Sequence, residues 1–72
     1  MTVEELETQI LAAHAAGDHS ALVDLYAQAA ELAEDANETG FFLTQAYIFA
    51  LETAHPDRPA LHGRLKEMGR ER

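Results

Sequence analysis

The residues of this chain whose chemistry first suggests a site are its four histidines. His14 and His19 flank Asp18, and a second group of histidine and aspartate lies within residues 55–62. Zinc requires three or four nitrogen, oxygen or sulfur ligands that converge on one point. The sequence has no cysteine and no His-x-x-x-His or His-Glu-x-x-His spacing, and a helix end is expected between His14 and Asp18. We therefore predict neither a metal site nor a bound cofactor.

The acidic residues do not form a recognisable catalytic motif either. General acid–base catalysis needs carboxylates with shifted pKa values in a pocket, whereas those at 4–7 and 31–35 fall on expected solvent faces of helices. Ser20 beside His19 is better explained by the chemistry of a helix start. The four glycines stand alone, so the chain has no glycine-rich phosphate loop. We predict that the chain is not an enzyme.

Charge is distributed unevenly along the 72 residues. The formal net charge is −8, from 13 acidic and 5 basic residues, and every lysine and arginine follows residue 57. An acidic chain repels phosphate backbones, so we expect no nucleic-acid partner. The uneven charge has two explanations, favourable cations at the end of the last helix or an acidic surface that is complementary to a basic partner protein. The acidic remainder favours a basic protein partner, and head-to-tail self-association of the two poles is a further interpretation.

Length and composition favour one small domain covering residues 1–72. Hydrophobic residues make up 47% of the chain, and many of them are alanine, so the core must rely on close helix packing. We find neither a signal-peptide pattern at the start nor an apolar run long enough to cross a bilayer. With no cysteine, these features lead us to expect a cytoplasmic protein that does not enter a membrane.

Periodicity and capping residues predict four helices. Thr2 and Glu5 form a capping box before a first helix whose apolar positions are Val3, Leu6, Ile10 and Ala13 or His14. Gly17 should end this helix and Asp18 should start the second, about 19–36. The second helix is expected to bury Leu22, Leu25, Tyr26, Ala29, Leu32, Ala33 and Ala36, with Asp24, Gln28, Glu31 and Asp35 on its opposite face.

The second half of the chain is predicted to hold a turn and two further helices. Residues 35–40 should form the turn. The third helix, about 41–55, is apolar around nearly its whole circumference, so it must be central or partly covered by another molecule. His-Pro-Asp at 55–57 should end it, and a fourth helix, about 58–69, should bury Leu61, Leu65 and Met68. Residues 70–72 are expected to fray.

The segment from Gly17 to Leu32 resembles the second helix of a tetratricopeptide or Sel1-like repeat. A Gly-Asp turn is followed at fixed offsets by an aromatic residue, here Tyr26, and by an alanine, here Ala29. The resemblance implies an all-α fold of two antiparallel hairpins, residues 1–36 and 40–70, and a repeat spacing of 38 residues lies within the range of helical repeats. It also implies protein binding on the surface of helices 1 and 3. A plain four-helix bundle stays open as an alternative.

These observations lead to a functional hypothesis centred on the third helix. Phe42 and Phe49, which lie seven residues apart and flank Gln45, are predicted to form an exposed anchor pair, bordered by Phe41 and Glu52. The alternative is that these aromatics belong to the core. We expect a non-catalytic interaction module or adaptor that binds a protein segment through helices 1 and 3. Two alternatives stay open, a homodimeric helical bundle or other homo-oligomer, and a small regulatory subunit of an enzyme.

Overall fold

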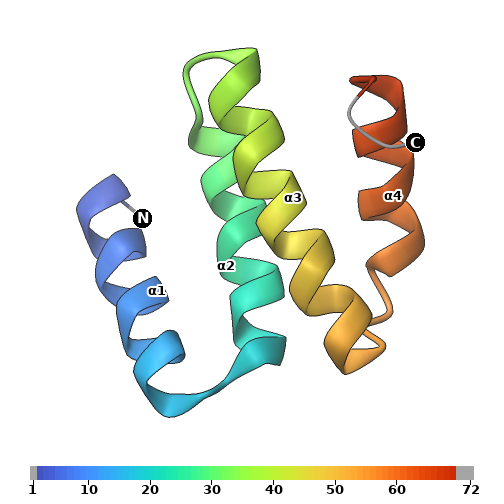
Figure 1. Ribbon diagram of the computed structural model, residues 1–72. Coiled ribbons are helices and arrows are strands. Elements are labelled where there is room, and N and C mark those ends of the chain that lie inside the picture. The colour runs from blue at the N-terminus through green and yellow to red at the C-terminus, as the bar shows by residue number, and fades with distance from the viewer. Residues whose placement is uncertain (1, 70–72) are drawn as a thin grey trace.

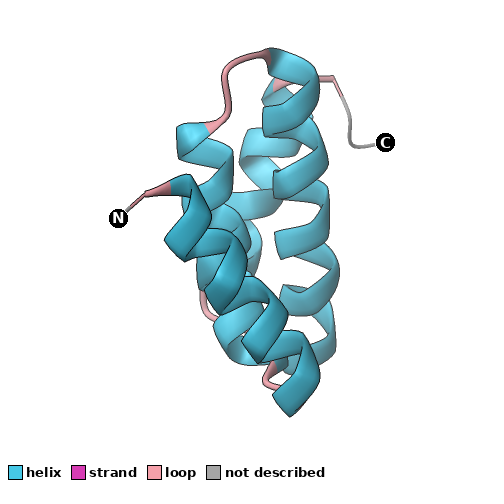
Figure 2. Cartoon of the chain, turned by 90° about the vertical axis from the view of Figure 1, so that its left-hand side faces the viewer, coloured by secondary structure: helices cyan, strands magenta, loops and turns pink. Residues whose placement is uncertain are grey.

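The computed structural model describes residues 2–69, which form four α-helices joined by short connections. The helices are α1 (Val3–Ala16), α2 (His19–Leu32), α3 (Ala36–Thr53) and α4 (Arg58–Glu67). Successive helices are antiparallel and lie side by side as two hairpins, with α1 and α4 at the ends of the row (Figure 1). The molecule is a slab of 31 × 28 × 14 Å, and it is narrower in the perpendicular view (Figure 2). The predicted all-α fold of four helices is confirmed.

The first hairpin is formed by the capping residues that the sequence indicated. The Thr2 hydroxyl accepts a hydrogen bond from the Glu5 N–H at 3.1 Å and so caps α1. Gly17 adopts the left-handed conformation, with φ of 68°, which lets the chain leave α1 without a Cβ clash. The Asp18 carboxylate then accepts from the Ala21 N–H at 3.1 Å. One turn therefore joins two capped helices.

The junction between α2 and α3 differs from the prediction. The predicted turn at 35–40 and the predicted end of the second helix at 36 are both wrong, because α2 ends at Leu32 and α3 begins at Ala36. The Asp35 carboxylate accepts from the Glu38 N–H at 2.8 Å and caps α3. Gly40 is buried in the middle of a helical turn. The polar composition of 35–40 resembles a loop, but with Asp35 as the N-cap residues 36–40 form the first turns of α3.

The second hairpin ends earlier than expected at both helices. Helix α3 stops at Thr53, where Ala54 takes a left-handed conformation with φ of 52°, and α4 stops at Glu67. Gly69 also has a positive φ of 73°, so the predicted continuation of the helix to 69 is wrong. The predicted frayed tail at 70–72 lies outside the described residues.

Two apolar clusters make up the core. The first joins α2, α3 and α4 and contains Val23, Ala30, Leu43, Ala46, Ala50, Leu61 and Leu65. The second joins α1 to α2 and contains Leu6, Ala13, Leu22, Leu25 and Ala29. Three rings, those of Tyr26, Phe42 and Phe49, pack against both clusters. These rings therefore connect the two halves of a thin, alanine-rich core.

The buried faces follow the predicted spacing except at the start of α1, where Val3 is 55% exposed, and near the end of α2. Tyr26 and Met68, both predicted to be buried, are half-buried. Leu22, Leu25 and Ala29 are buried as predicted, whereas the predicted burial of Leu32 and Ala36 is wrong. Ala33 is only half-buried. Because α2 ends at Leu32, the residues after it do not continue the stripe that faces the core.

Helix α3 occupies a central place in the row, since it packs against both α2 and α4. Its outward side nevertheless leaves three large apolar side chains exposed, Phe41, Ile48 and Leu51. The apolar circumference of this helix is therefore only partly covered within one copy of the chain.

Candidate protein-binding surface

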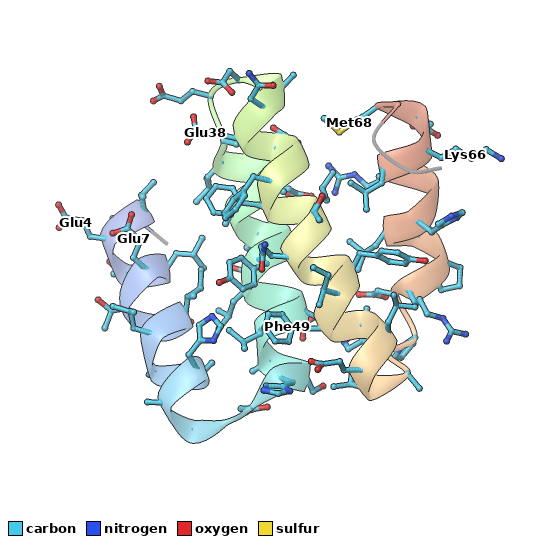
Figure 3. The ribbon with its side chains drawn as sticks, viewed as in Figure 1. Glu4, Glu7, Glu38, Phe49, Lys66 and Met68 are labelled. Carbon is cyan, nitrogen blue, oxygen red and sulfur yellow. The ribbon has the colours of Figure 1, made fainter. Side chains whose placement is uncertain are left out.

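Aromatic rings from α1, α2 and α3 meet in one layer, which we call the aromatic face and define as His14, Tyr26, Phe42 and Phe49. Tyr26 lies between the two phenylalanines, with ring centroids 6.3 Å from Phe42 and 6.1 Å from Phe49, and it is nearly parallel to Phe49. Phe42 and Phe49 are two helical turns apart on α3, and this separation leaves room for the Tyr26 ring near both of them. In Figure 3, Phe49 lies on the α1 side of α3, beside α2.

His14 closes the aromatic face from the side of α1. Its Nε2 lies 2.9 Å from the Tyr26 hydroxyl, and its ring meets Phe49 edge-on at 5.7 Å. These distances allow one hydrogen bond and one edge-to-face contact, both of which fix the orientation of the Tyr26 and Phe49 rings. The last turn of α1 is thereby joined to α2 and α3 through a single side chain.

His19, at the start of α2, contacts one ring of the aromatic face, that of Phe49. Its ring lies 5.1 Å from that of Phe49, and its Nδ1 lies 3.3 Å from a carboxylate oxygen of Glu52. Both partners of this pair are about half exposed, so the contact contributes little to stability. Through His19, the Glu52 carboxylate is linked to the Phe49 end of the aromatic face.

The structure places the five predicted binding residues on one side of α3 but not at equal depth. Phe42 and Phe49 are half-buried, so the exposed anchor pair is only partly accessible. Phe41 is 55% exposed and meets Phe42 edge-on at 5.4 Å. Gln45 is half-buried between the two phenylalanine turns, and Glu52 is exposed. Together they form a surface on which phenylalanine rings lie beside the Gln45 amide and the Glu52 carboxylate.

The sequence pattern did not indicate His14, His19, Tyr26 or Ile48 as members of this surface. The signal for the histidines was present, because each lies next to the α1–α2 turn that brings helix ends together. Pairing them with Phe49 required knowing which face of α3 turns toward α1. Ile48 was assigned to the general apolar circumference of the third helix, yet its side chain is exposed.

Burial changes the acid–base chemistry of one group on the aromatic face. Desolvation raises the pKa of the Tyr26 phenol above its ordinary value of about 10, since the packed rings disfavour the phenolate. Tyr26 therefore stays neutral across the physiological range. The face offers a neutral hydroxyl and an imidazole in an apolar setting, with Glu52 as a nearby anionic group.

A second constellation brings α2 to the α3–α4 turn. The ligand atoms of Asp24, His55 and Asp57 lie within 4.8 Å of one another. His55 Nδ1 accepts a hydrogen bond from the Asp57 N–H at 3.1 Å, and its Nε2 lies 3.6 Å from Asp24 Oδ1. An imidazole that accepts at Nδ1 carries its proton at Nε2, which then faces Asp24. Because the lone pair is engaged, this arrangement supports a structural link better than a metal site.

The other predicted histidine groupings are separated by the fold. Asp18 caps α2 and does not share a site with His14. The His62 ring packs against Tyr47, with centroids 5.6 Å apart, in the groove between α3 and α4. His14 is therefore not grouped with Asp18, and His62 packs against Tyr47.

Comparison with known proteins identifies no relative of this chain: no family model, no curated protein and no solved structure matches it. Among residues 2–69, no helix has both the length and the apolar character needed to cross a membrane.

Proposed function

We propose that this chain is a non-catalytic protein-interaction module whose aromatic face, with Phe41 and Ile48 beside it, binds a segment of another protein. The observation that carries the proposal is the partial exposure of packed rings. Tyr26, Phe42 and Phe49 are held rigidly by mutual contacts, so a partner can bind them with little loss of side-chain entropy. Rigid aromatic groups bordered by polar side chains are typical of binding hot spots.

Charge supports a basic partner. Residues 1–57 contain no lysine or arginine, and Glu52 lies at the edge of the aromatic face. Cationic side chains would approach such a surface faster than anionic ones, and their aliphatic stems would pack on the exposed parts of the rings. The absence of cysteine from the sequence supports a cytoplasmic setting for this binding. The arrangement as two antiparallel hairpins supports a tetratricopeptide-like use of α1 and α3.

Nuclear magnetic resonance can locate the binding surface. Uniformly labelled protein would be titrated with a synthetic amphipathic helix that carries leucine on one face and lysine or arginine on the other. A peptide of the same length with glutamate at each cationic position is the control. We expect the cationic peptide to shift the amide signals of the last turns of α1 and of Gln45, Phe49 and Glu52. Shifts confined to α4, or equal binding of both peptides, would contradict the proposal.

A further inference from the structure

The two ends of the helix row carry opposite charge. Helix α1 contains Glu4, Glu5 and Glu7 and no lysine or arginine, whereas α4 contains Arg58, Arg64 and Lys66 and one glutamate. In Figure 3, Glu4 points away from the molecule at one end of the row and Lys66 points away at the other. Each copy of the chain therefore presents an acidic flank and a basic flank that face in opposite directions.

Each flank also has a feature that no contact among the described residues explains, an exposed leucine on α1 and a mid-helix glycine on α4. On α1, Leu11 is 70% exposed, the largest exposed fraction among the large apolar side chains of the described residues. On α4, Gly63 lies in mid-helix, where glycine costs about 1 kcal/mol relative to alanine. A Cβ atom at Gly63 would meet nothing within 4 Å among residues 2–69, so no contact in this part of the chain requires a glycine there.

The geometry points to head-to-tail association of copies of this chain, in which the α1 flank of one copy packs on the α4 flank of the next, with Leu11 seated over Gly63. Helices run alternately up and down the row, so repeating the row sets α1 antiparallel to the preceding α4 (Figure 1). That orientation continues the packing of the helices within one copy. A glycine surface is the place where a leucine side chain can approach a helix backbone closely.

Charge favours the same arrangement. Glu7 lies four residues before Leu11, and Lys66 lies three residues after Gly63, so each is about one helical turn from the apolar contact. In the antiparallel arrangement these two turns meet, which brings a glutamate of one copy beside a lysine of the next. The α1 flank and the α4 flank are thus complementary in charge. A second copy of the chain is therefore the partner that fits either flank.

This contact is heterologous, because it uses a different surface on each copy, and repetition along the row extends it beyond a dimer. It does not use the aromatic face, so it is independent of the proposed partner binding. A symmetric dimer through the exposed α3 residues would instead use one surface twice, and the following experiment distinguishes the two.

The test uses two variants that each block one flank. Leu11→Glu introduces charge at an exposed position of α1, and Gly63→Gln fills the space on α4 with a good helix former. Circular dichroism checks that both fold, and Glu7→Lys serves as a second α1-flank variant. Sedimentation velocity over a concentration series then measures the association of the wild type and of each variant alone. It also measures the association of a one-to-one mixture of Leu11→Glu and Gly63→Gln.

We expect the wild type to form species that grow with concentration and dissociate as salt is added. Each variant alone should associate at least about tenfold more weakly. The mixture should form a heterodimer and nothing larger, because Leu11→Glu keeps an intact α4 flank and Gly63→Gln keeps an intact α1 flank. A monomeric wild type, variants that still self-associate, or a mixture that stays monomeric would each overturn the inference.

Discussion

At the scale of single residues, Tyr26 combines aromatic contacts with a hydrogen bond to another helix. Its ring contacts Phe42 and Phe49, its hydroxyl pairs with His14, and it packs against both apolar clusters. Replacing it should therefore affect packing between the two hairpins as well as the proposed binding surface.

The raised pKa of Tyr26 predicts a pH dependence of stability. The folded chain favours the neutral phenol, so this contribution is fully present below the unfolded pKa of about 10 and is lost as pH rises through the higher folded pKa. In Tyr26→Phe, the free energy of unfolding should fall less steeply with pH in the alkaline range. Urea unfolding at a series of pH values measures this slope. An unchanged slope in the variant would show that Tyr26 does not contribute.

Ala54 is a second residue whose backbone makes a prediction. It ends α3 in the left-handed region, which costs a non-glycine residue about 1–2 kcal/mol, and its side chain is exposed. Ala54→Gly should therefore raise the free energy of unfolding by up to about 1 kcal/mol, after the larger chain entropy of glycine is included. Thermal unfolding measures the change. A lower midpoint would mean that Ala54 is not strained.

At the scale of elements, capping determines where α3 begins. Asp35 and Asp57 occupy equivalent N-cap positions, but only Asp35 makes a side-chain hydrogen bond to its helix. Asp35→Ala should cost about 1 kcal/mol, and Asp57→Ala, the matched control, should cost less. Chemical denaturation of both variants measures the difference. Equal losses would contradict the assignment of the cap.

The existence of the four helices could be predicted from the sequence. The residues at which the helices begin and end, and the side chains that neighbouring helices contribute, were harder to predict. Leu61 and Leu65 in α4, and Leu22 and Leu25 in α2, followed from spacing alone. The start of α3 did not, because Asn37 to Gly40 favour a turn locally, whereas the Asp35 cap and the burial of Gly40 accompany a helix there. The intrinsic preferences of these residues do not determine whether they form a turn or the first turn of a helix.

The binding surface was predicted in part for a related reason. The seven-residue spacing of Phe42 and Phe49 put both rings on one side of α3 without the structure. Their partial burial depends on Tyr26 and His14, which arrive from other helices. Spacing within one helix carries no information about rings supplied by its neighbours.

At the scale of the whole molecule, the chain is a thin row of helices in which the rings of the aromatic face connect two small apolar clusters. A slab of this kind buries less apolar surface per residue than a globule, so large side chains such as Phe41 and Ile48 stay exposed. The same geometry provides a broad face for a partner, which links the architecture to the proposed function.

The central claim is that binding is localised to the aromatic face, and a pair of charge reversals tests it most directly. Glu52→Lys changes the edge of that face, and Glu31→Lys makes the same change in net charge on the solvent face of α2, where Glu31 is exposed. Calorimetric titration with the cationic amphipathic peptide measures both affinities. We predict that Glu52→Lys weakens binding about fivefold more than Glu31→Lys does. Equal weakening by the two variants would show that attraction is spread over the acidic molecule, and it would contradict a site on the aromatic face.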